Sequence, residues 1–481
     1  MDTIKTDMER ATLPCIAFAV LSVAAFTALM LAFYPGLLIS DAMTGYSGAV
    51  RGYVDDAYGI FWNVVLIALA KVSGSPVAAS MVQAGVYIVL CAILLKRISR
   101  GPTWVGWLGV ILLLSPVFLV SAFYQHRDTA FALAFLGLML ALMRSQGRFD
   151  LWAVFAATLC CLFRPDFLIA YAAGGLVMAR TAWRCSGGFR HKTVLLWMIA
   201  PVFAVLFRVV MPDVTTIAAR GDGQKVSLTV QPVCAVVEET RAYDALPEPT
   251  RNAIEVMFPR QGLEERCAIR NIWIFWSPDN RLGQTDDAQR KAYFNAVGDI
   301  ISKNMPLIAG RGVAMHLSAN GMGHEVEGFM DFLKTPETLE PQFASDLIDT
   351  SPRLDGLRDR IMPLIDATSG QGFSVWRAIL MNSVPVIALL LLFHRFGRHV
   401  LLDAAVVMVV VRSATLLVAP SAQYAYHFPV HLAGTALLLW VLAYRRGDNP
   451  SATEETISYE PRPVEADAGM QREFTHVQLR K

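Results

Sequence analysis

The stretch YGIFWNVVLIALAKV, residues 58–72, decides how this chain is arranged. It is mostly apolar, but its fifteen residues fall short of the roughly 20 that a membrane-crossing helix needs. If this stretch crosses a bilayer, every segment after it lies on the opposite side from where it would otherwise lie. The positions of the later basic residues therefore decide between the two arrangements.

The chain around this stretch is strongly apolar. Its 481 residues are 54% hydrophobic and 17% charged, whereas a soluble globular domain carries about 25% charged residues. The net charge of +2 gives no indication of a nucleic-acid partner. We therefore expect an all-α, polytopic membrane protein. The six longest apolar runs are 13–34, 77–95, 103–122, 193–211, 376–394 and 400–419, and four shorter ones are 129–143, 149–163, 167–183 and 428–444.

Basic residues follow several of these runs, and cytoplasmic loops carry an excess of Lys and Arg. With a cytoplasmic N-terminus and residues 58–72 not crossing, all the basic clusters lie inside; if 58–72 crosses, they lie outside. This predicts about ten transmembrane helices, with both termini cytoplasmic and a helix at 58–72 lying on the outer membrane surface. The clusters are Lys96/Arg97/Arg100, Arg144/Arg148, Arg180/Arg184/Arg190/Lys192, Arg395/Arg398 and Arg445/Arg446.

The same arrangement divides the chain into four regions. Residues 1–211 form a membrane module of about seven helices with a first outer loop at 35–76. Residues 212–375 form a small periplasmic cap, expected to be mostly helical because 290–310 and 353–366 are amphipathic. Residues 376–446 form a second membrane module of about three helices, and 447–481 a cytoplasmic tail expected to be disordered.

Two local features refine this outline. As one helix, residues 149–183 would be about 50 Å long, so we expect two helices joined by a turn at 164–166. The seven cysteines are too few and too scattered for a disulfide framework or a zinc site. Cys234 and Cys267 lie in the cap region and are able to form a disulfide if the cap is extracytoplasmic.

Polar and ionisable side chains gather in the predicted outer loops. Such groups near a membrane are costly and are functional candidates, and here four separate loops supply them to one side. Arginine suits phosphate, and a carboxylate can act as a general base toward a hydroxyl. Each group also has an ordinary alternative as a solvated loop residue, an interfacial anchor, a helix cap or an aromatic-belt residue. The candidates are Asp41, Arg51 and Asp56; His126, Arg127 and Asp128; Arg164 and Asp166; and Tyr424, Tyr426 and His427.

At these residues the sequence resembles the GT-C superfamily of polytopic membrane glycosyltransferases, and in particular a bacterial branch of largely unassigned substrate. That branch has a YPG…S-D-S segment, matched by YPGLLISDA at 34–42, and a G…DWHPP segment, matched in part by GYVDDAYG at 52–59. Its FGSP segment is matched by KVSGSP at 71–76. Its W-K-D, R-H-N and R-Y-x-x-P segments correspond to 126–128, 164–166 and 424–429.

The resemblance implies an activity and a set of roles. The enzyme would transfer a sugar from a polyprenyl-phosphate donor to a glycan, lipid or other hydroxyl acceptor, at the periplasmic face of the cell inner membrane. Asp41 would be the general base, Asp128 would position a substrate, and Arg127 and Arg164 would hold the leaving phosphate. No cofactor is implied with certainty, and no residue pattern supports a divalent metal.

Two other functions fit the same topology. An O-antigen polymerase or ligase would have a large outer loop and chemistry centred on arginines. A polysaccharide or lipid transporter commonly shows internal repeats and broken helices near the midplane, and we find no repeat between the two halves of the sequence. Arg412, inside the 400–419 run, receives no assignment from the sequence.

Overall fold

The structure analysed is a computed structural model, and the description below covers most of the chain. The described residues are 2–34, 36–38, 42, 45–46, 54–55, 59–144, 150–184, 189–214, 217–218, 222–267, 280–319, 353–369, 383–394, 400–418 and 424–444.

The described part of the chain is almost entirely helical, as the sequence predicts. The first module contains α1 (Asp2–Ala32), α3 (Ile60–Ser73), α4 (Val77–Ile98), α5 (Thr103–Leu113), α6 (Pro116–Phe123), α7 (Arg127–Arg144), α8 (Leu151–Phe163), α9 (Phe167–Arg184) and α10 (Phe189–Val214). The cap region contains α11 (Asp222–Glu238), α12 (Thr240–Asp244), α13 (Glu248–Met257), α14 (Arg260–Arg266), η1 (Leu282–Gln284), α16 (Asp287–Ala319) and α17 (Asp355–Ser369). The last module contains α19 (Ser383–His394), α20 (Val400–Thr415), η3 (Leu416–Val418) and α21 (Tyr424–Ala443).

Three described helices are long and apolar enough to cross a membrane: residues 12–32 of α1, and α4 and α21. The helices α5 and α6 together would make a fourth span, with a bend of 55° between them. Several shorter apolar helices surround these, among them α3, α8 and the apolar parts of α9 and α10. The structure thus supports a membrane protein with three or four candidate spans among its described residues.

The 103–122 run differs from its prediction as one unbroken helix, because the helix breaks at Ser115-Pro116. Ser115 has an extended backbone, with φ −58° and ψ 143°. A residue before proline is pushed out of the helical region, and proline lacks the N–H that would continue the hydrogen-bond pattern. The chain therefore restarts with Pro116 in the first turn of α6.

The start of the last helix also differs from its prediction. Residues 424–427 were expected in an outer loop before a helix at 428–444, but α21 begins at Tyr424. Pro429 lies inside this helix, where it removes only one backbone hydrogen bond near the start. Tyr424, Tyr426 and His427 are therefore held in the first turns of a helix.

The ends of helices from the two membrane modules meet at two opposite ends of the helix bundle. At one end, Nη1 of Arg97 in the last turn of α4 donates to the Leu140 carbonyl of α7 at 2.7 Å. The Tyr444 hydroxyl, just after α21, donates to the Arg97 carbonyl at 2.8 Å. The N-terminal ends of α7 and α21 meet at the opposite end, with the predicted turn between α8 and α9. Arg97 and Tyr444 therefore lie at one end of these helices, and the candidate site lies at the other.

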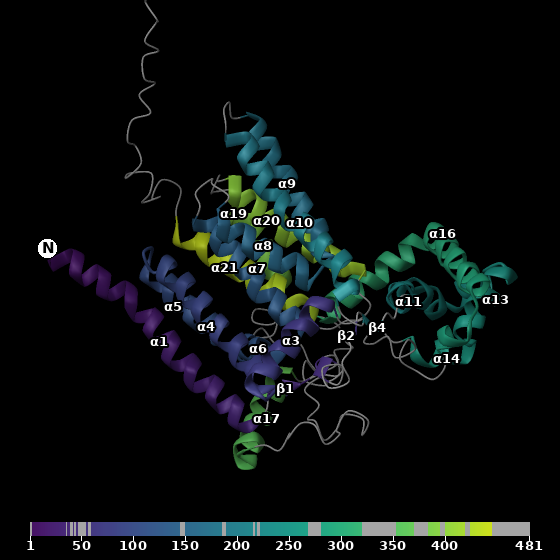
Figure 1. Cartoon of the computed structure of the whole chain (residues 1–481), viewed down its shortest axis with the longest axis horizontal. Coiled ribbons are helices and arrows are strands. Elements are labelled where there is room, and N and C mark those ends of the chain that lie inside the picture. The colour runs from purple at the N-terminus through teal and green to yellow at the C-terminus, as the bar shows by residue number, and fades with distance from the viewer. Residues whose placement is uncertain are drawn as a thin grey trace, which may run out of the picture.

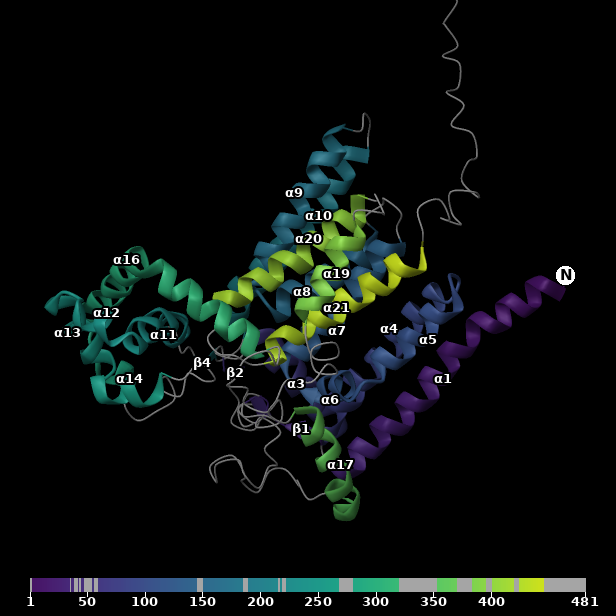
Figure 2. The same cartoon turned by 180° about the vertical axis from the view of Figure 1, so that it is seen from behind.

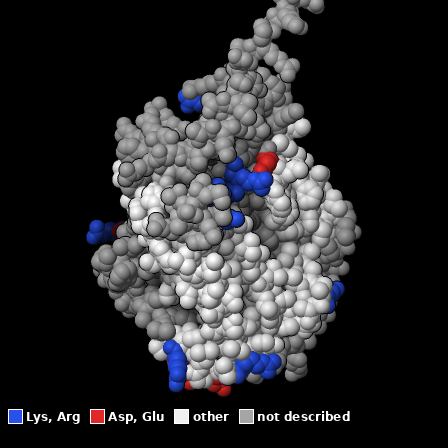
Figure 3. All heavy atoms as spheres, turned by 90° about the vertical axis from the view of Figure 1, so that its left-hand side faces the viewer, with Lys and Arg blue, Asp and Glu red and all other residues white. Residues whose placement is uncertain are grey.

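The outside of the membrane modules is apolar. Figure 3 shows a broad area of one face without charged side chains, bordered by Lys and Arg residues above and below. Large hydrophobic side chains remain exposed along several helices, as expected for contact with lipid. Examples are Val20 on α1, Val89 on α4, Ile111 on α5, and Phe203 and Val209 on α10.

The cap has a hydrophobic core of its own. Figures 1 and 2 show α11, α13, α14 and the first part of α16 gathered apart from the other helices. Val230 and Cys234 of α11, Ile254 of α13 and Ile300 of α16 are among its buried residues. The helix α16 bends at Asn304, where the backbone is not helical, and continues toward the membrane modules. The predicted helices at 290–310 and 353–366 are confirmed as parts of α16 and α17.

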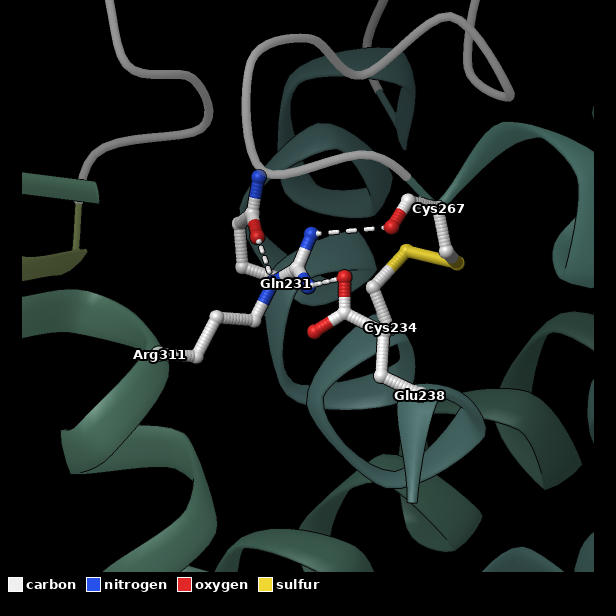
Figure 4. Close-up of a disulfide and its surroundings, with 5 residues drawn as sticks. All are labelled: Gln231, Cys234, Glu238, Cys267 and Arg311. Carbon is white, nitrogen blue, oxygen red and sulfur yellow. Dashed lines mark hydrogen bonds and ion pairs between the residues drawn. A yellow bond between two sulfur atoms is a disulfide. The ribbon is translucent and has the colours of Figure 1, made fainter. Parts of the chain in front are cut away.

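The predicted disulfide is confirmed. Cys234 of α11 is bonded to Cys267, which follows α14, with Cα atoms 5.2 Å apart. Figure 4 shows Arg311 of α16 beside this bond. Its Nε donates to Oε1 of Gln231 at 2.7 Å, its Nη2 donates to the Cys267 carbonyl at 3.4 Å, and it forms an ion pair with Glu238.

The helix α17, also within the predicted cap region, lies elsewhere. Its residues Leu357, Ile361 and Met362 pack against the core of the membrane modules. Just before it, the backbone N–H groups of Arg353 and Leu354 donate to the Leu31 carbonyl near the end of α1, each at 3.1 Å. The cap region therefore contains one part with its own core and one part that belongs to the end of α1.

Two short strand pairs, which the sequence did not predict, tie the first outer loop to distant segments. Strand β1 (Leu37–Leu38) pairs in parallel with β3 (Tyr124–Gln125), with Leu38 opposite Gln125. Strand β2 (Val54–Asp55) pairs in parallel with β4 (Ile217–Ala218). The first pair brings the chain after α1 directly beside the turn that begins α7.

Candidate functional site

The first part of the site is the turn before α7. His126 ends the α6–α7 connection, and Asp128 lies in the first turn of α7, where a negative charge is favoured by the helix dipole. Nδ1 of His126 is 3.2 Å from Oδ2 of Asp128. Both side chains are buried, and that of Asp128 is 0% exposed. A carboxylate so completely buried needs a positive partner in the structure.

Arg164 is that partner, and it comes from the turn between α8 and α9. The proline at 165 forces Arg164 into an extended conformation, with φ −135° and ψ 90°, which ends α8. Nε of Arg164 lies 3.3 Å from Oδ1 of Asp128 and 3.1 Å from Oδ1 of Asp166. The predicted split of 149–183 into two helices is therefore confirmed, and its turn carries two of the predicted site residues.

Arg412 completes the arrangement from the last turn of α20. Its Nη1 lies 2.5 Å from Oδ2 of Asp166, and its guanidinium carbon lies 5.3 Å from the ring centre of Phe131. The side chain is 1% exposed. Its Nε and Nη2 are buried and have no hydrogen-bond partner in the structure as described. We call the series His126, Asp128, Arg164, Asp166 and Arg412 the charged row.

Arg164 and Asp166, two members of the charged row, are held in their ionised forms. Burial by itself would raise the pKa of Asp166, but Arg164 and then Arg412 outweigh burial and hold that pKa well below its usual range. Burial likewise would lower the pKa of Arg164, but Asp128 and Asp166 keep it above its usual value. Asp166 is the accessible acid of the row, because its side chain is 45% exposed while that of Asp128 is fully buried.

Tyr426 and Arg127 border the charged row. The guanidinium carbon of Arg164 lies 5.6 Å from the ring centre of Tyr426. Arg127 is half-buried beside Asp128 and contributes to the low pKa of Asp166. A Cβ atom placed on Gly59, just before α3, would lie 4.0 Å from Nη1 of Arg127. Gly59, in the middle of the first outer loop, therefore lies close to Arg127.

Aromatic side chains of α3 cover the neighbouring helix ends. Phe61 packs edge-on against Phe163 and Phe207, with ring centres 5.0 and 5.5 Å apart. Trp62 also contacts Phe163, the last residue of α8. The helix predicted at 58–72 is present as α3, and it places an apolar wall beside Arg164.

Tyr424 and His427 belong to a different neighbourhood from Tyr426. The Tyr424 hydroxyl lies 2.6 Å from Nδ1 of His431, one of the buried residues of α21. The His427 ring packs edge-on against His316 of α16, with ring centres 4.6 Å apart. These residues therefore join α21 to itself and to the helix that comes from the cap.

The structure brings together six of the predicted residues at the site: His126, Arg127, Asp128, Arg164, Asp166 and Tyr426. The predicted residues Asp41, Arg51 and Asp56 lie outside the described residues.

Sequence reasoning missed the roles of Arg412, His316 and Gln125. Arg412 could have been singled out as a charged residue inside an apolar run. No local sequence pattern distinguishes His316 or Gln125. Among the described residues, no group of three His, Cys, Asp or Glu side chains is placed to hold a metal ion.

The described part of the site holds three arginines, at 127, 164 and 412, and two aspartates, at 128 and 166. Guanidinium groups form strong hydrogen bonds to anionic groups such as phosphate. No protein-family model, no curated protein and no solved structure matches the chain.

Proposed function

We propose that the protein is an integral membrane glycosyltransferase that moves a sugar from a polyprenyl-phosphate donor to a hydroxyl group of a glycan or lipid. The observation that carries the proposal is Arg412, a buried arginine at the end of an apolar helix bundle, two of whose nitrogens have no hydrogen-bond partner among the described residues. A polyprenyl phosphate joins a phosphate to a long apolar chain, and this arrangement offers surfaces for both parts.

Arg412 supports the proposed binding of the lipid phosphate. Its Nε and Nη2 are buried without a hydrogen-bond partner among the described residues, and buried polar atoms are normally satisfied. Arginine presents several N–H groups in one plane, which suits the oxygens of a phosphate. Arg127 and Arg164 flank the same place, so charge that develops on a leaving phosphate would be stabilised there.

The first outer loop bears on the proposed role of Asp41 as general base. Leu38 pairs with Gln125, directly before His126, and Ala42 is buried in the membrane-module core. Asp41 itself lies outside the described residues, and its proposed role as general base comes from the resemblance of 34–42 to the family segment.

The disulfide supports the proposed orientation. Disulfides persist in oxidising compartments and are rare in the bacterial cytoplasm, so the Cys234–Cys267 bond favours a periplasmic cap. The charged row lies at the end of the bundle that α16 reaches from the cap, through the contact of His316 with His427. We therefore propose a periplasmic site in the inner membrane, and the number of about ten membrane helices stays a prediction from the sequence.

In the proposed reaction, Asp41 removes the proton of the acceptor hydroxyl. The acceptor oxygen then forms a bond to the anomeric carbon, while the bond from that carbon to the phosphate oxygen breaks. Polyprenyl phosphate leaves with the electron pair and is held by Arg127, Arg164 and Arg412. Asp128 is fully buried, so its part is to hold Arg164 in place and not to contact the substrate.

The number of arginines also favours a second candidate, an O-antigen ligase or polymerase with arginine-centred chemistry. The two candidates differ in their dependence on Asp41. Loss of activity in Arg127→Ala with full activity in Asp41→Asn would favour the ligase or polymerase.

The decisive experiment measures transfer by the purified protein from a panel of polyprenyl-phosphate hexoses and pentoses to a membrane glycolipid fraction. We expect one donor to be consumed, and Asp41→Asn to reduce transfer by about 10²–10⁴-fold, the range for loss of a general base. The matched control is Asp299→Asn, an exposed cap residue, which should transfer normally. Full transfer by Asp41→Asn would contradict the assignment.

A further inference from the structure

The two acids of the charged row differ in how far they reach solvent. The side chain of Asp128 is fully buried, whereas that of Asp166 is 45% exposed. Asp166 nevertheless bridges two arginines, with Oδ1 3.1 Å from Nε of Arg164 and Oδ2 2.5 Å from Nη1 of Arg412. It is therefore the solvent-accessible partner of both arginines, and a ligand that arrives from solvent competes with this carboxylate.

Both arginines have further contacts that hold them in place. Nε of Arg164 also lies 3.3 Å from Oδ1 of the buried Asp128. Nη1 of Arg412 lies 3.4 Å from the Thr415 hydroxyl, and its guanidinium carbon lies 5.3 Å from the ring centre of Phe131. Departure of the exposed aspartate would therefore leave both guanidinium groups near their present positions.

The carboxylate of Asp166 also has a second partner within reach. Asp166 directly precedes α9, which begins at Phe167. In this N-cap position an Asp side chain commonly accepts a hydrogen bond from the second or third N–H of the helix. The third N–H of α9, that of Ile169, makes a long bond of 3.4 Å to the Asp166 carbonyl. Turning toward this N–H would keep the carboxylate near the positive end of the helix dipole.

Arg412 gives a phosphate an advantage over the carboxylate. The Arg412 side chain is 1% exposed, and its Nε and Nη2 have no hydrogen-bond partner among the described residues. The carboxylate reaches only Nη1, whereas the several oxygens of a phosphate can bind more than one N–H of a guanidinium. A phosphate beside the Asp166 carboxylate would be repelled by its charge. Binding to Arg412 therefore requires that Asp166 moves away.

We propose that Asp166 is an exchangeable partner of Arg164 and Arg412, which holds both arginines in the empty site and gives them up to the phosphate group of a ligand. The competition lowers the apparent affinity for every such ligand, because only part of the population is able to bind. The catalytic meaning rests on the proposed function: the return of Asp166 to the arginines would help polyprenyl phosphate to leave after transfer. The exchange itself is measured without any enzymatic activity.

The first measurement is binding of inorganic phosphate to the purified protein, followed by thermal stabilisation at an ionic strength kept constant with NaCl. Asp166→Asn keeps the shape and one acceptor oxygen but removes the charge. We expect its apparent affinity for phosphate to rise about 10- to 100-fold, the range for hydrogen bonds to a charged group. The matched control is Asp299→Asn, an exposed cap residue, which should bind phosphate as the unaltered protein does.

Equal or weaker binding by Asp166→Asn would overturn the proposal, because Asp166 would then only position the arginines. Adding Arg412→Gln to Asp166→Asn should abolish the gain. A gain that persists would also overturn the proposal, since the phosphate would bind elsewhere. If Asp166→Asn is too unstable to purify, phosphate should recover folded protein where NaCl of equal ionic strength does not. Failure of phosphate to do so would contradict the exchange.

The second measurement separates the exchange from the proposed function. Polyprenyl phosphate should gain affinity for Asp166→Asn by about the same factor as inorganic phosphate, because both ligands replace the same carboxylate. If both gains appear but no donor is consumed by the unaltered protein, the exchange stands and the glycosyltransferase proposal fails. If the unaltered protein transfers sugar and Asp166→Asn shows neither gain, the exchange fails and the proposed function stands. A gain for inorganic phosphate alone would contradict a shared site and overturn the exchange.

Discussion

Two buried arginines, Arg311 in the cap and Arg412 at the candidate site, differ in how their guanidinium groups are bound. Arg311 is 6% exposed and is bound by the Gln231 side chain, the Cys267 carbonyl and Glu238. Arg412 is bound mainly by Asp166, and its Nε and Nη2 have no partner among the described residues. The first arginine has partners on each side of its guanidinium, whereas the second keeps the capacity to bind something else.

The surroundings explain this difference. Arg311 connects α16 to α11 beside a disulfide, in a part of the cap with its own hydrophobic core. Arg412 lies in the charged row, where helices from both membrane modules meet. A buried charge without full partners is costly, which agrees with the proposed phosphate-binding role of Arg412. Four predictions test this contrast, and they are given in order of decreasing effect.

The largest effect is expected at the buried acid of the charged row. Asp128→Ala removes a fully buried partner of Arg164. We expect the free energy of unfolding in detergent to fall by about 3–5 kcal/mol, the cost of breaking a buried ion pair. The control is Asp287→Ala, which removes an almost fully exposed partner of Arg290 and should cost less than about 1 kcal/mol. Equal small losses would mean that Asp128 is not buried against Arg164.

The next effect is expected in the cap. The Cys234–Cys267 bond closes a segment with a sequence separation of 33, which the loop-entropy model relates to about 3–4 kcal/mol of stability. Cys234→Ser together with Cys267→Ser should therefore unfold the cap at lower denaturant, measured by limited proteolysis of α11 to α14. Reductant should have the same effect on the unaltered protein and none on the double variant. Resistance of the unaltered protein to reductant would contradict the prediction.

The two arginines should separate binding from stability. Arg412→Gln is expected to weaken binding of polyprenyl phosphate about 10- to 100-fold, the range for hydrogen bonds to a charged group. Arg311→Gln should leave that affinity unchanged and lower the thermal unfolding midpoint of the cap. Affinity is measured by ligand-induced thermal stabilisation, with polyprenol, which lacks phosphate, as the control ligand. Weaker binding in both variants would remove the contrast between the two sites.

The smallest effect is a pH dependence of the contact between the cap helix and α21. Burial lowers the pKa of His316 below its usual value of about 6.5. The unfolded state therefore binds more protons just below that value, so the stability from neutral His316 is present above pH 6.5 and is lost as pH falls below it. The unfolding midpoint should fall between pH 7.5 and about 5. His316→Gln should reduce this slope, and an unchanged slope would exclude His316 as its cause.

Much of the helical outline could be predicted from the sequence. The apolar runs that became α1 and α4 are long and contain no charged residue, so composition alone locates them. The turn at 164–166 could be predicted because one helix across 149–183 would have been too long for a bilayer. The break at Ser115-Pro116 was missed because hydropathy does not register the backbone restriction that proline imposes.

Composition and spacing along the chain were enough to predict that apolar helices dominate, that Cys234 and Cys267 could pair, and that ionisable residues gather in a few short connections. The contact of Arg412 with Asp166, 246 positions away, and the contacts of Gln125 with Leu38 and Tyr46 became visible only in the folded protein. Such contacts depend on how distant segments pack against one another, and no local pattern of residues encodes the neighbour across an interface.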